Sequence, residues 1–186
     1  MSISVDWFTR DATKDDLDTI QNIYSYYVVH TTSSFEYEAP TVEEMERRFD
    51  DIKKKGLPFI VAGDNDTKEV YGYAYATTYK VRAAYNNSVE DSIFLRHGFN
   101  RKGLGTILLQ ELIKQCTVLG LRQMIAHIGH EDLGSVALHK KLGFEHKGTV
   151  TAIGYKLNTW IDMSCYQLTL GDGSNSPPSF VLGGLQ

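Results

Sequence analysis

The sequence predicts a single α/β domain of the mixed α+β kind, with about seven strands and about four helices. Runs rich in β-branched and aromatic residues alternate along the chain with segments whose apolar residues recur at helical spacing. The chain has 186 residues, 42% hydrophobic and 23% charged, a balance typical of one globular domain. Because no repeat or linker divides it, we expect one domain over 1–170 and a flexible tail over 171–186.

The first part of the chain predicts a short strand and two helices. Residues 5–8 favour a strand, and Thr13 with Asp16 forms a helix start with an acidic first turn. A capping box over 41–44 begins the second helix. The apolar face of the first helix consists of Leu17, Ile20, Ile23, Tyr24, Tyr27 and Val28, and that of the second of Met45, Phe49 and Ile52.

The middle of the chain predicts a hairpin followed by a strand, a turn and a helix. Residues 59–62 and 70–76 are β-rich runs joined by a polar turn, which favours an antiparallel hairpin. A strand over 89–95 then leads through a glycine-rich turn into a helix that ends at Gly120. The apolar residues of this helix recur every fourth position, at Leu104, Leu108, Leu112 and Cys116.

The last part of the chain predicts three more strands and a short helix. Residues 124–128 indicate a buried strand, and 135–142 a short helix that ends at Gly143. Two strands at about 146–155 and 160–170 then complete the sheet.

The charge and hydropathy of the chain exclude several classes of protein. Lys and Arg number 19 against 23 Asp and Glu, so the net charge of −4 does not suit nucleic acid or anionic lipid. No stretch approaches the ~18 uninterrupted apolar residues of a membrane span, and no secretory signal is found. We therefore expect a cytoplasmic protein, without excluding entry into the nucleus, and no nucleic-acid or membrane partner.

The cysteines and histidines indicate neither a disulfide framework nor a metal site. Cys116 and Cys165 lie far apart in the sequence, and we expect both to be buried as small apolar residues. His127 and His130 are three positions apart on a predicted strand, which directs their rings to opposite faces. We expect no metal.

The glycine-rich turn over 100–106, Asn-Arg-Lys-Gly-Leu-Gly-Thr, indicates an anion site. Backbone N–H groups at a helix N-terminus can approach a phosphate there, and Arg101 and Lys102 would reinforce the attraction. Neither the dinucleotide fingerprint Gly-x-Gly-x-x-Gly nor the P-loop pattern is present. Taken alone, such a turn is more often structural than a ligand site.

The same turn resembles the acyl-CoA loop Gln/Arg-x-x-Gly-x-Gly/Ala of the GNAT acetyltransferases. Within that superfamily the chain is most similar to the phosphinothricin and methionine sulfoximine N-acetyltransferases, from about Phe8 to Leu170. Four motifs carry the resemblance: Thr31-Thr32 with Phe35-Glu36, Val89-Glu90-Asp91-Ser92, Ser135 through Leu138-His139 to Leu142-Gly143-Phe144, and Gly154-Tyr155-Lys156 with Trp160-Ile161-Asp162. The chain departs from the family at Asn100, in place of Gln or Arg, and at Asp132, in place of Asn.

The resemblance implies a mostly antiparallel sheet and transfer of acetyl from acetyl-CoA to the primary amine of a small amino acid analogue. It implies that Glu90 is the general base and that His139 transfers a proton, as acid or as base. The cofactor-binding residues it implies are Ile93, Phe94, Leu95, Arg101, Lys102, Gly103, Leu104, Gly105, Thr106 and Asp132. The acceptor-binding residues are Thr32, Phe35, Arg82, Ala83, Ala84 and Tyr85, with Arg82 as an anion clamp. Direct attack in a ternary complex is preferred to transfer through Cys116.

Other interpretations stay open on the residues alone. In these alternatives, Glu90 is a solvated loop carboxylate, His139 is a core or surface histidine, and Arg82 is a loop residue that faces solvent. Alternative acceptors are a polyamine, another metabolite or a peptide N-terminus, and a non-catalytic acyl-CoA-binding module is a further alternative. The resemblance also implies a homodimer in which the last strands and the tail lie near the partner.

Overall fold

The computed structural model describes residues 6–129 and 132–178. Its first half forms β1 (Trp7–Asp11), α1 (Leu17–His30), α2 (Val42–Lys54), β2 (Phe59–Asp64) and β3 (Val70–Thr78). The strand expected at 5–8 is shifted to Trp7–Asp11, because pairing with β2 extends as far as Asp11 opposite Ile60. A short 3-10 turn precedes α1, and the capping pair of Thr13 and Asp16 begins this turn, with Thr13 N donating to Asp16 Oδ2 at 2.8 Å.

The second half follows the order expected from the sequence. It forms β4 (Ser88–Leu95), α3 (Leu104–Val118), β5 (Gln123–Gly129), α4 (Leu133–Lys141), β6 (Glu145–Lys156) and β7 (Thr159–Thr169). The expected four-residue stripe of α3 is fully buried, from Leu104 to Cys116. Cys165 is only half-buried, which corrects the expectation for that thiol, because it alternates along β7 with the buried Ser164 and Tyr166.

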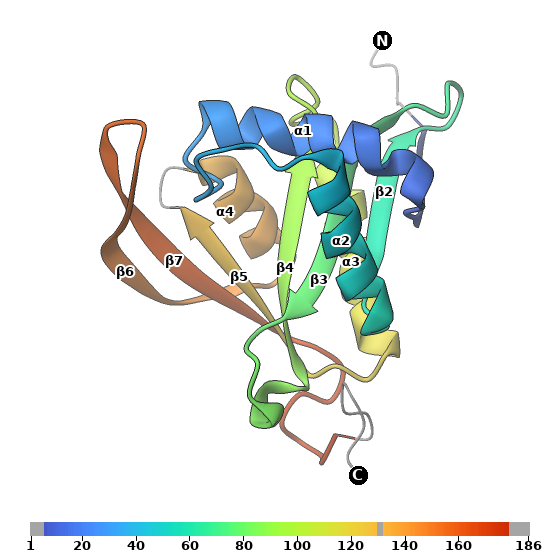
Figure 1. Cartoon of the computed structure of the whole chain (residues 1–186). Coiled ribbons are helices and arrows are strands. Elements are labelled where there is room, and N and C mark those ends of the chain that lie inside the picture. Colours follow the sequence, from blue (N-terminus) through green and yellow to red (C-terminus); the bar gives the residue numbers. More distant parts are fainter. Residues whose placement is uncertain (1–5, 130–131, 179–186) are drawn as a thin grey trace.

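The strands form one sheet in the order β1-β2-β3-β4-β5-β7-β6 (Figure 1). Every neighbouring pair is antiparallel except β4 with β5, which is parallel. This arrangement confirms the mixed, mostly antiparallel sheet.

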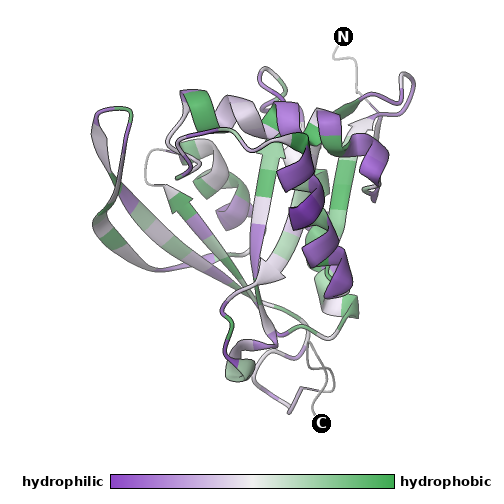
Figure 2. Ribbon diagram, in the orientation of Figure 1, coloured by the Kyte–Doolittle hydropathy of each residue, from purple (hydrophilic) through white to green (hydrophobic). Residues whose placement is uncertain are grey.

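Helices cover the sheet on both sides. In Figure 1, α1 and α2 lie in front of the sheet and α3 behind it. Figure 2 shows hydrophobic positions along the central strands, while α2 carries many hydrophilic positions. The apolar core lies between these layers, and its largest fully buried side chains include Phe59, Tyr73 and Leu108. None of the helices in the described part of the chain is long and apolar enough to cross a membrane.

The one parallel strand pair opens the sheet. Pairing between β4 and β5 covers only three positions, from Ser88 opposite Gln123 to Glu90 opposite Ile125. Beyond Glu90 the two strands diverge, as Figure 1 shows. From Asp91 to Leu95, β4 therefore keeps β3 as its neighbour on one side and leaves its other edge free of a strand.

The start of the expected tail is attached to the domain. Arg122 Nη2 donates to Ser176 Oγ at 3.1 Å and to the Pro177 carbonyl at 3.0 Å. Residues 171–178 therefore lie against the start of β5, whereas the sequence predicted a flexible tail from residue 171. Residues 179–186 lie outside the described residues.

Candidate active site

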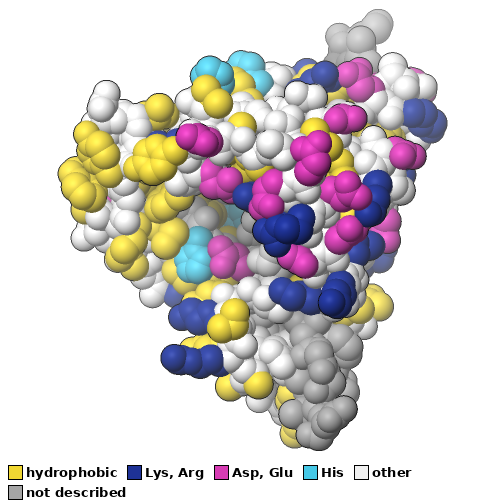
Figure 3. Space-filling view, in the orientation of Figure 1, with side chains coloured by type: hydrophobic (Ala, Val, Ile, Leu, Met, Phe, Trp, Pro, Cys, Tyr) yellow, Lys and Arg dark blue, Asp and Glu magenta, His cyan; other side chains and the backbone are white. Residues whose placement is uncertain are grey.

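Two adjoining cavities lie where β4 and β5 separate. The smaller has a volume of about 400 Å³ and the larger of about 600 Å³. Both are lined by Tyr27, Ile93, Asp132 and Ser135, so the two cavities share a wall. Figure 3 shows this part of the surface as a hollow beside the β6–β7 side of the molecule, with histidine and acidic side chains next to each other at its rim.

The free edge of β4 presents backbone groups to the cavities. The backbone N–H and C=O groups of successive residues in a strand point to opposite edges. Because Arg96 N donates to the Tyr71 carbonyl in β3, the backbone groups of Leu95 point to the free edge of β4. Tyr27 Oη accepts from Leu95 N at 3.3 Å and donates to Leu95 O at 2.7 Å. By the same alternation, the backbone groups of Ile93 point to the free edge and those of Phe94 point to β3. Phe94 also lines the smaller cavity.

The larger cavity contains the glycine-rich turn. Gly103 is the N-cap of α3 with φ +87°, and nothing lies within 4 Å of the position of a Cβ atom. Arg101 also has a positive φ, of 61°. The first N–H groups of α3 lack partners within the helix and can donate hydrogen bonds to an anion. Leu104 is buried, so only its backbone can serve this role.

Two cations line the larger cavity, and one of them was not predicted. Arg101 comes from the turn, and Lys141 from the last turn of α4, where its Nζ lies 3.4 Å from Thr106 Oγ1. Nothing in the sequence signals Lys141, because its approach depends on how α4 ends against α3. Lys102 points elsewhere, with its Nζ 4.4 Å from the centre of the Phe99 ring.

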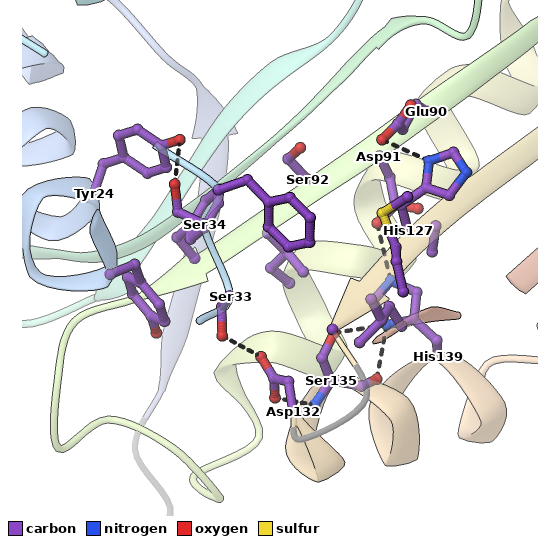
Figure 4. A pocket seen from close by; sticks show the side chains of 18 of the residues that line it. Tyr24, Ser33, Ser34, Glu90, Asp91, Ser92, His127, Asp132, Ser135 and His139 are labelled. Atoms are coloured by element: carbon purple, nitrogen blue, oxygen red, sulfur yellow. Dashed lines mark hydrogen bonds and ion pairs between the residues drawn. The ribbon is translucent and has the colours of Figure 1, made fainter. Parts of the chain in front are cut away.

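Asp132 is one of the residues that line both cavities. As the N-cap of α4, its carboxylate accepts from Ser135 N at 2.9 Å and from Ser33 Oγ at 2.9 Å (Figure 4). Both of its oxygens therefore have donors within the protein. This aspartate fixes the start of α4, and its charge is partly satisfied before any anionic ligand approaches.

An open strand edge, an anion cradle and two cations together fit an acyl-CoA. The amide groups of its pantetheine arm match the free edge of β4 at Ile93 and Leu95. Its phosphates match the N-terminus of α3, with Arg101 and Lys141 beside it. The thioester end would then point toward the smaller cavity, at the residues that both cavities share.

Glu90 is paired with a histidine on the neighbouring strand. His127 Nδ1 lies 2.9 Å from Glu90 Oε1, and the two side chains are 23% and 32% exposed (Figure 4). The hydrogen bond to Glu90 raises the pKa of His127 and outweighs the partial burial that lowers it. Tyr79 stacks on the imidazole, with ring centres 6.0 Å apart. From the sequence, His127 was considered only as a metal ligand, and no pattern indicated this pair.

His139 is buried in the wall of the same cavity. Its Nε2 lies 2.9 Å from Asp91 Oδ2 and its Nδ1 lies 2.8 Å from the Ser135 carbonyl, and the His139 and Asp91 side chains are 2% and 1% exposed. Burial lowers the pKa of His139, but the hydrogen bonds to Asp91 and Ser135 outweigh it, so the net shift is upward. Both ring nitrogens are therefore engaged within the protein, while Asp91 Oδ1 has no hydrogen-bond partner among the described residues.

The predicted acceptor residues divide into two groups. Phe35 lines the smaller cavity, together with Glu36, whose carboxylate forms a double hydrogen bond with Arg48 at 2.7 and 3.1 Å. Thr32 is not part of the described lining of either cavity, but its carbonyl lies next to Gly129, which lines the smaller one. By contrast, the loop residues Arg82, Ala83, Ala84 and Tyr85 are not part of the described lining of either cavity. Tyr85 is connected to the site through Tyr79, 5.6 Å from it between ring centres.

No metal site is found among residues 6–129 and 132–178, where no three His, Cys, Asp or Glu side chains gather suitably. The other histidine considered as a ligand, His130, lies outside the described residues.

Comparison with known proteins supports an acyl-CoA site. A family model for the acetyltransferase (GNAT) domain matches residues 9–165. The chain is 38% identical to the phosphinothricin N-acetyltransferase of Alcaligenes faecalis, over 88% of this chain and 83% of that protein. It is 34% identical to the L-methionine sulfoximine/L-methionine sulfone acetyltransferase of Pseudomonas aeruginosa, over 90% and 97%. The crystal structure of a phosphinothricin acetyltransferase from Sinorhizobium meliloti in complex with AcCoA is 42% identical, with a TM-score of 0.90 over 93% of each chain.

Proposed function

The chain belongs to the GNAT acetyltransferase family, and from this premise we propose that it acetylates the primary amine of a small amino acid analogue. The acceptors we propose are of the phosphinothricin, methionine sulfoximine and methionine sulfone type. The similarity over nearly the whole chain to enzymes named for these compounds supports this substrate class. Acetyl-CoA is the acetyl donor and supplies the acetyl group as an activated thioester.

The position of Glu90 carries the proposal. It is the last β4 residue to pair with β5, so its carboxylate lies where the strands separate and lines the smaller cavity. An amine must lose a proton before or during attack on a thioester, and a carboxylate beside the cavity can accept it. One oxygen of Glu90 is bonded to His127, and the other is available for the acceptor ammonium or a bridging water.

We propose direct attack of the amine on the thioester, without an acyl-enzyme intermediate. Burial raises the pKa of Cys116 to about 12, so this thiol stays protonated and is no nucleophile. His139 remains our candidate for the second proton transfer, to the departing thiolate. Because its Nε2 faces Asp91 and its Nδ1 faces the Ser135 carbonyl, a protonated His139 would give its Nε2 proton to Asp91, and the Asp91 carboxyl would give a proton to the thiolate.

The carboxylates around the smaller cavity help to decide between an acceptor with one amine and a polyamine. Four carboxylates line the smaller cavity, at Glu36, Glu90, Asp91 and Asp132. Each is already bonded to a partner within the protein, at Arg48, His127, His139 and Ser33 respectively. A polycation would have to compete for these carboxylates, so the pairing favours an acceptor with a single amine. The polyamine stays an outcome of the substrate test.

We also propose a homodimer formed through the β6–β7 hairpin. Large apolar side chains are exposed there, at Val150, Ile153, Tyr155, Leu157 and Trp160, with Tyr37 beside them. Figure 3 shows hydrophobic side chains gathered on this side of the molecule. A group of this kind is typical of a protein contact.

Sedimentation at micromolar concentration is expected to give twice the monomer mass, and Trp160→Asp is expected to shift the mass toward that of the monomer. The cytoplasmic location stays a prediction.

The substrate test is thiol release from acetyl-CoA with mass detection of the product. The acceptors are phosphinothricin, methionine sulfoximine and methionine sulfone, compared with spermidine, glutamate, lysine and a short peptide. We expect turnover with the first three. Turnover confined to another amine would retain the chemistry and reject the acceptor class, and acetyl-CoA binding without turnover would support a non-catalytic module.

The test of the general base is Glu90→Gln, which keeps the size of the side chain but removes the proton acceptor. We expect kcat to fall by roughly 10²-fold or more, with acetyl-CoA binding nearly unchanged. The matched control is Glu145→Gln, an exposed residue of β6 paired with Lys147. Unchanged turnover in Glu90→Gln would reject the assignment.

A further inference from the structure

The Glu90–His127 pair contains a titratable group that the proposed mechanism does not use. His127 lies on β5 two residues beyond Ile125, the last β5 residue paired with β4, and its Nδ1 bonds to Glu90 across the opening. Both side chains line the smaller cavity. The imidazole is 23% exposed, so its free edge can exchange a proton with solvent.

Charged and titratable groups surround His127 on three sides. From β4, Glu90 is bonded to the ring and Asp91 lies close enough to favour its protonated form. From the loop after β3, Tyr79 stacks on the ring and Lys80 opposes its protonation. From β7, Cys165 is the register partner of His127. The carboxylate bond is the strongest of these influences.

We propose that His127 is a positioning residue for Glu90, holding its carboxylate through the Nδ1–Oε1 hydrogen bond and setting the pH range in which Glu90 accepts a proton. The inference rests on the proposed role of Glu90 as general base. The Nδ1–H of His127 donates to Glu90 Oε1 whether or not Nε2 carries a proton, and Glu90 takes the proton of the ammonium on its other oxygen. When Nε2 is protonated, the positive charge of the ring favours the ionised carboxylate and opposes the uptake of that proton. When the Nε2 proton has left to solvent, the neutral ring keeps the hydrogen bond and no longer opposes the uptake.

The sign of the pH dependence follows from this arrangement. Because the hydrogen bond to Glu90 raises the pKa of His127 above its ordinary value of about 6.5, the ring keeps its proton to a higher pH than a free imidazole does. The second-order rate constant kcat/KM should therefore rise with pH as His127 loses its proton. A residue that only supported the fold would not produce this limb.

The decisive variant is His127→Asn. The Asn amide places an N–H donor near the position of Nδ1, so the hydrogen bond to Glu90 is retained while titration is lost. We expect the ratio of wild-type to variant kcat/KM to rise by about tenfold between about pH 5.5 and 7.5. Ionisation of the amine substrate affects both proteins equally and cancels in this ratio. A ratio that stays flat across the range would overturn the proposal.

The matched control is His146→Asn. His146 is a histidine of β6 that lies outside both cavities and bonds to Thr149. Its pH profile is expected to coincide with that of the wild type. His127→Ala, which removes the donor as well, should also lose the limb and in addition lower the plateau of kcat/KM.

A second measurement separates this inference from the proposed function. NMR titration of the His127 ring requires no turnover, and in Glu90→Gln its pKa should fall toward the ordinary value. An unchanged His127 titration in Glu90→Gln would overturn the pair itself. If no amine is acetylated although the titration shifts, the proposed function fails and the pairing is upheld.

Discussion

The hydroxyl of Tyr27 bonds to both backbone groups of Leu95, accepting from its N–H at 3.3 Å and donating to its carbonyl at 2.7 Å. A side chain of α1 thus satisfies the free edge of β4 at the residue expected to pair with the pantetheine arm. A ligand that adds to this edge has to displace the hydroxyl. Tyr27 is therefore predicted to compete with acetyl-CoA for Leu95.

The variant Tyr27→Phe tests this competition, because it removes the hydroxyl and keeps the ring that packs on Phe94. A hydrogen bond contributes about 1 kcal/mol net, so we expect the Kd of acetyl-CoA to fall by about three- to tenfold. Isothermal titration calorimetry measures the change. Tyr26→Phe, on the adjacent residue, is the control and should leave the Kd unchanged. Weaker binding in Tyr27→Phe would show that the hydroxyl supports the ligand.

The buried Asp91–His139 pair predicts a stability that depends on pH. In Asp91→Asn the imidazolium of His139 loses its charged partner, which costs about 3 kcal/mol or more in a buried site. Because the pKa of His139 is raised in the folded protein, the pair stabilises fully below the unfolded value of about 6.5. That stabilisation is lost as the pH rises through the folded value.

Urea unfolding at several pH values tests this prediction. The difference in free energy of unfolding between wild type and Asp91→Asn should be largest at about pH 6 and smaller at about pH 9. Asp66→Asn, in the exposed turn between β2 and β3, is the control. A difference that is constant with pH would mean that His139 does not titrate in this range.

The elements with strong periodicity could be predicted from the sequence, and their ends could not. The buried faces of α1 and α3 follow from apolar spacing alone, because burial of one helix face imposes a period of 3.6 residues. Strand ends depend on partners far along the chain. Thus β3 continues to Thr78 because it pairs with Val89, and β1 continues to Asp11 because it pairs with Ile60.

The same distinction applies to the site. Motifs close in sequence identified Glu90, His139 and the turn at 100–106, which the structure brings to two adjoining cavities. The pairing of His127 with Glu90 and the approach of Lys141 depend on the spacing between strands and between helices. Such contacts join residues 35 or more positions apart and leave no local pattern.

Arg82 gives a sharp test of the acceptor class. It lies at the N-cap of a short 3-10 turn over Ala83–Tyr85 and is exposed, so it can act as an anion clamp only if this loop approaches the bound acceptor. If it does, Arg82→Ala should raise KM about tenfold for acceptors with an acidic group and leave KM unchanged for an amine without one. Arg96→Ala, in an exposed pair with Glu69, is the control. An equal KM in wild type and Arg82→Ala would reject the clamp.

Gly154 and Phe35 are predicted to act together on the acceptor cavity. A Cβ atom at Gly154 would lie 2.7 Å from Phe35 Cε2, so no side chain fits at Gly154 unless the ring moves. Phe35 lines the smaller cavity, and Gly154 belongs to β6, where it pairs with Ile161. The glycine therefore permits the ring of Phe35 to lie against the hairpin, and its substitution should push the ring toward the acceptor.

In Gly154→Ala we expect KM for the acceptor to rise by about three- to tenfold, because a methyl group forced into a filled contact costs on the order of 1 kcal/mol. The Kd of acetyl-CoA should not change, since the glycine-rich turn lies in the other cavity. Phe35→Leu shortens the ring side chain, so adding Gly154→Ala to Phe35→Leu should have little further effect. Additive effects of the two substitutions on KM would mean that Gly154 acts through the hairpin and not through Phe35.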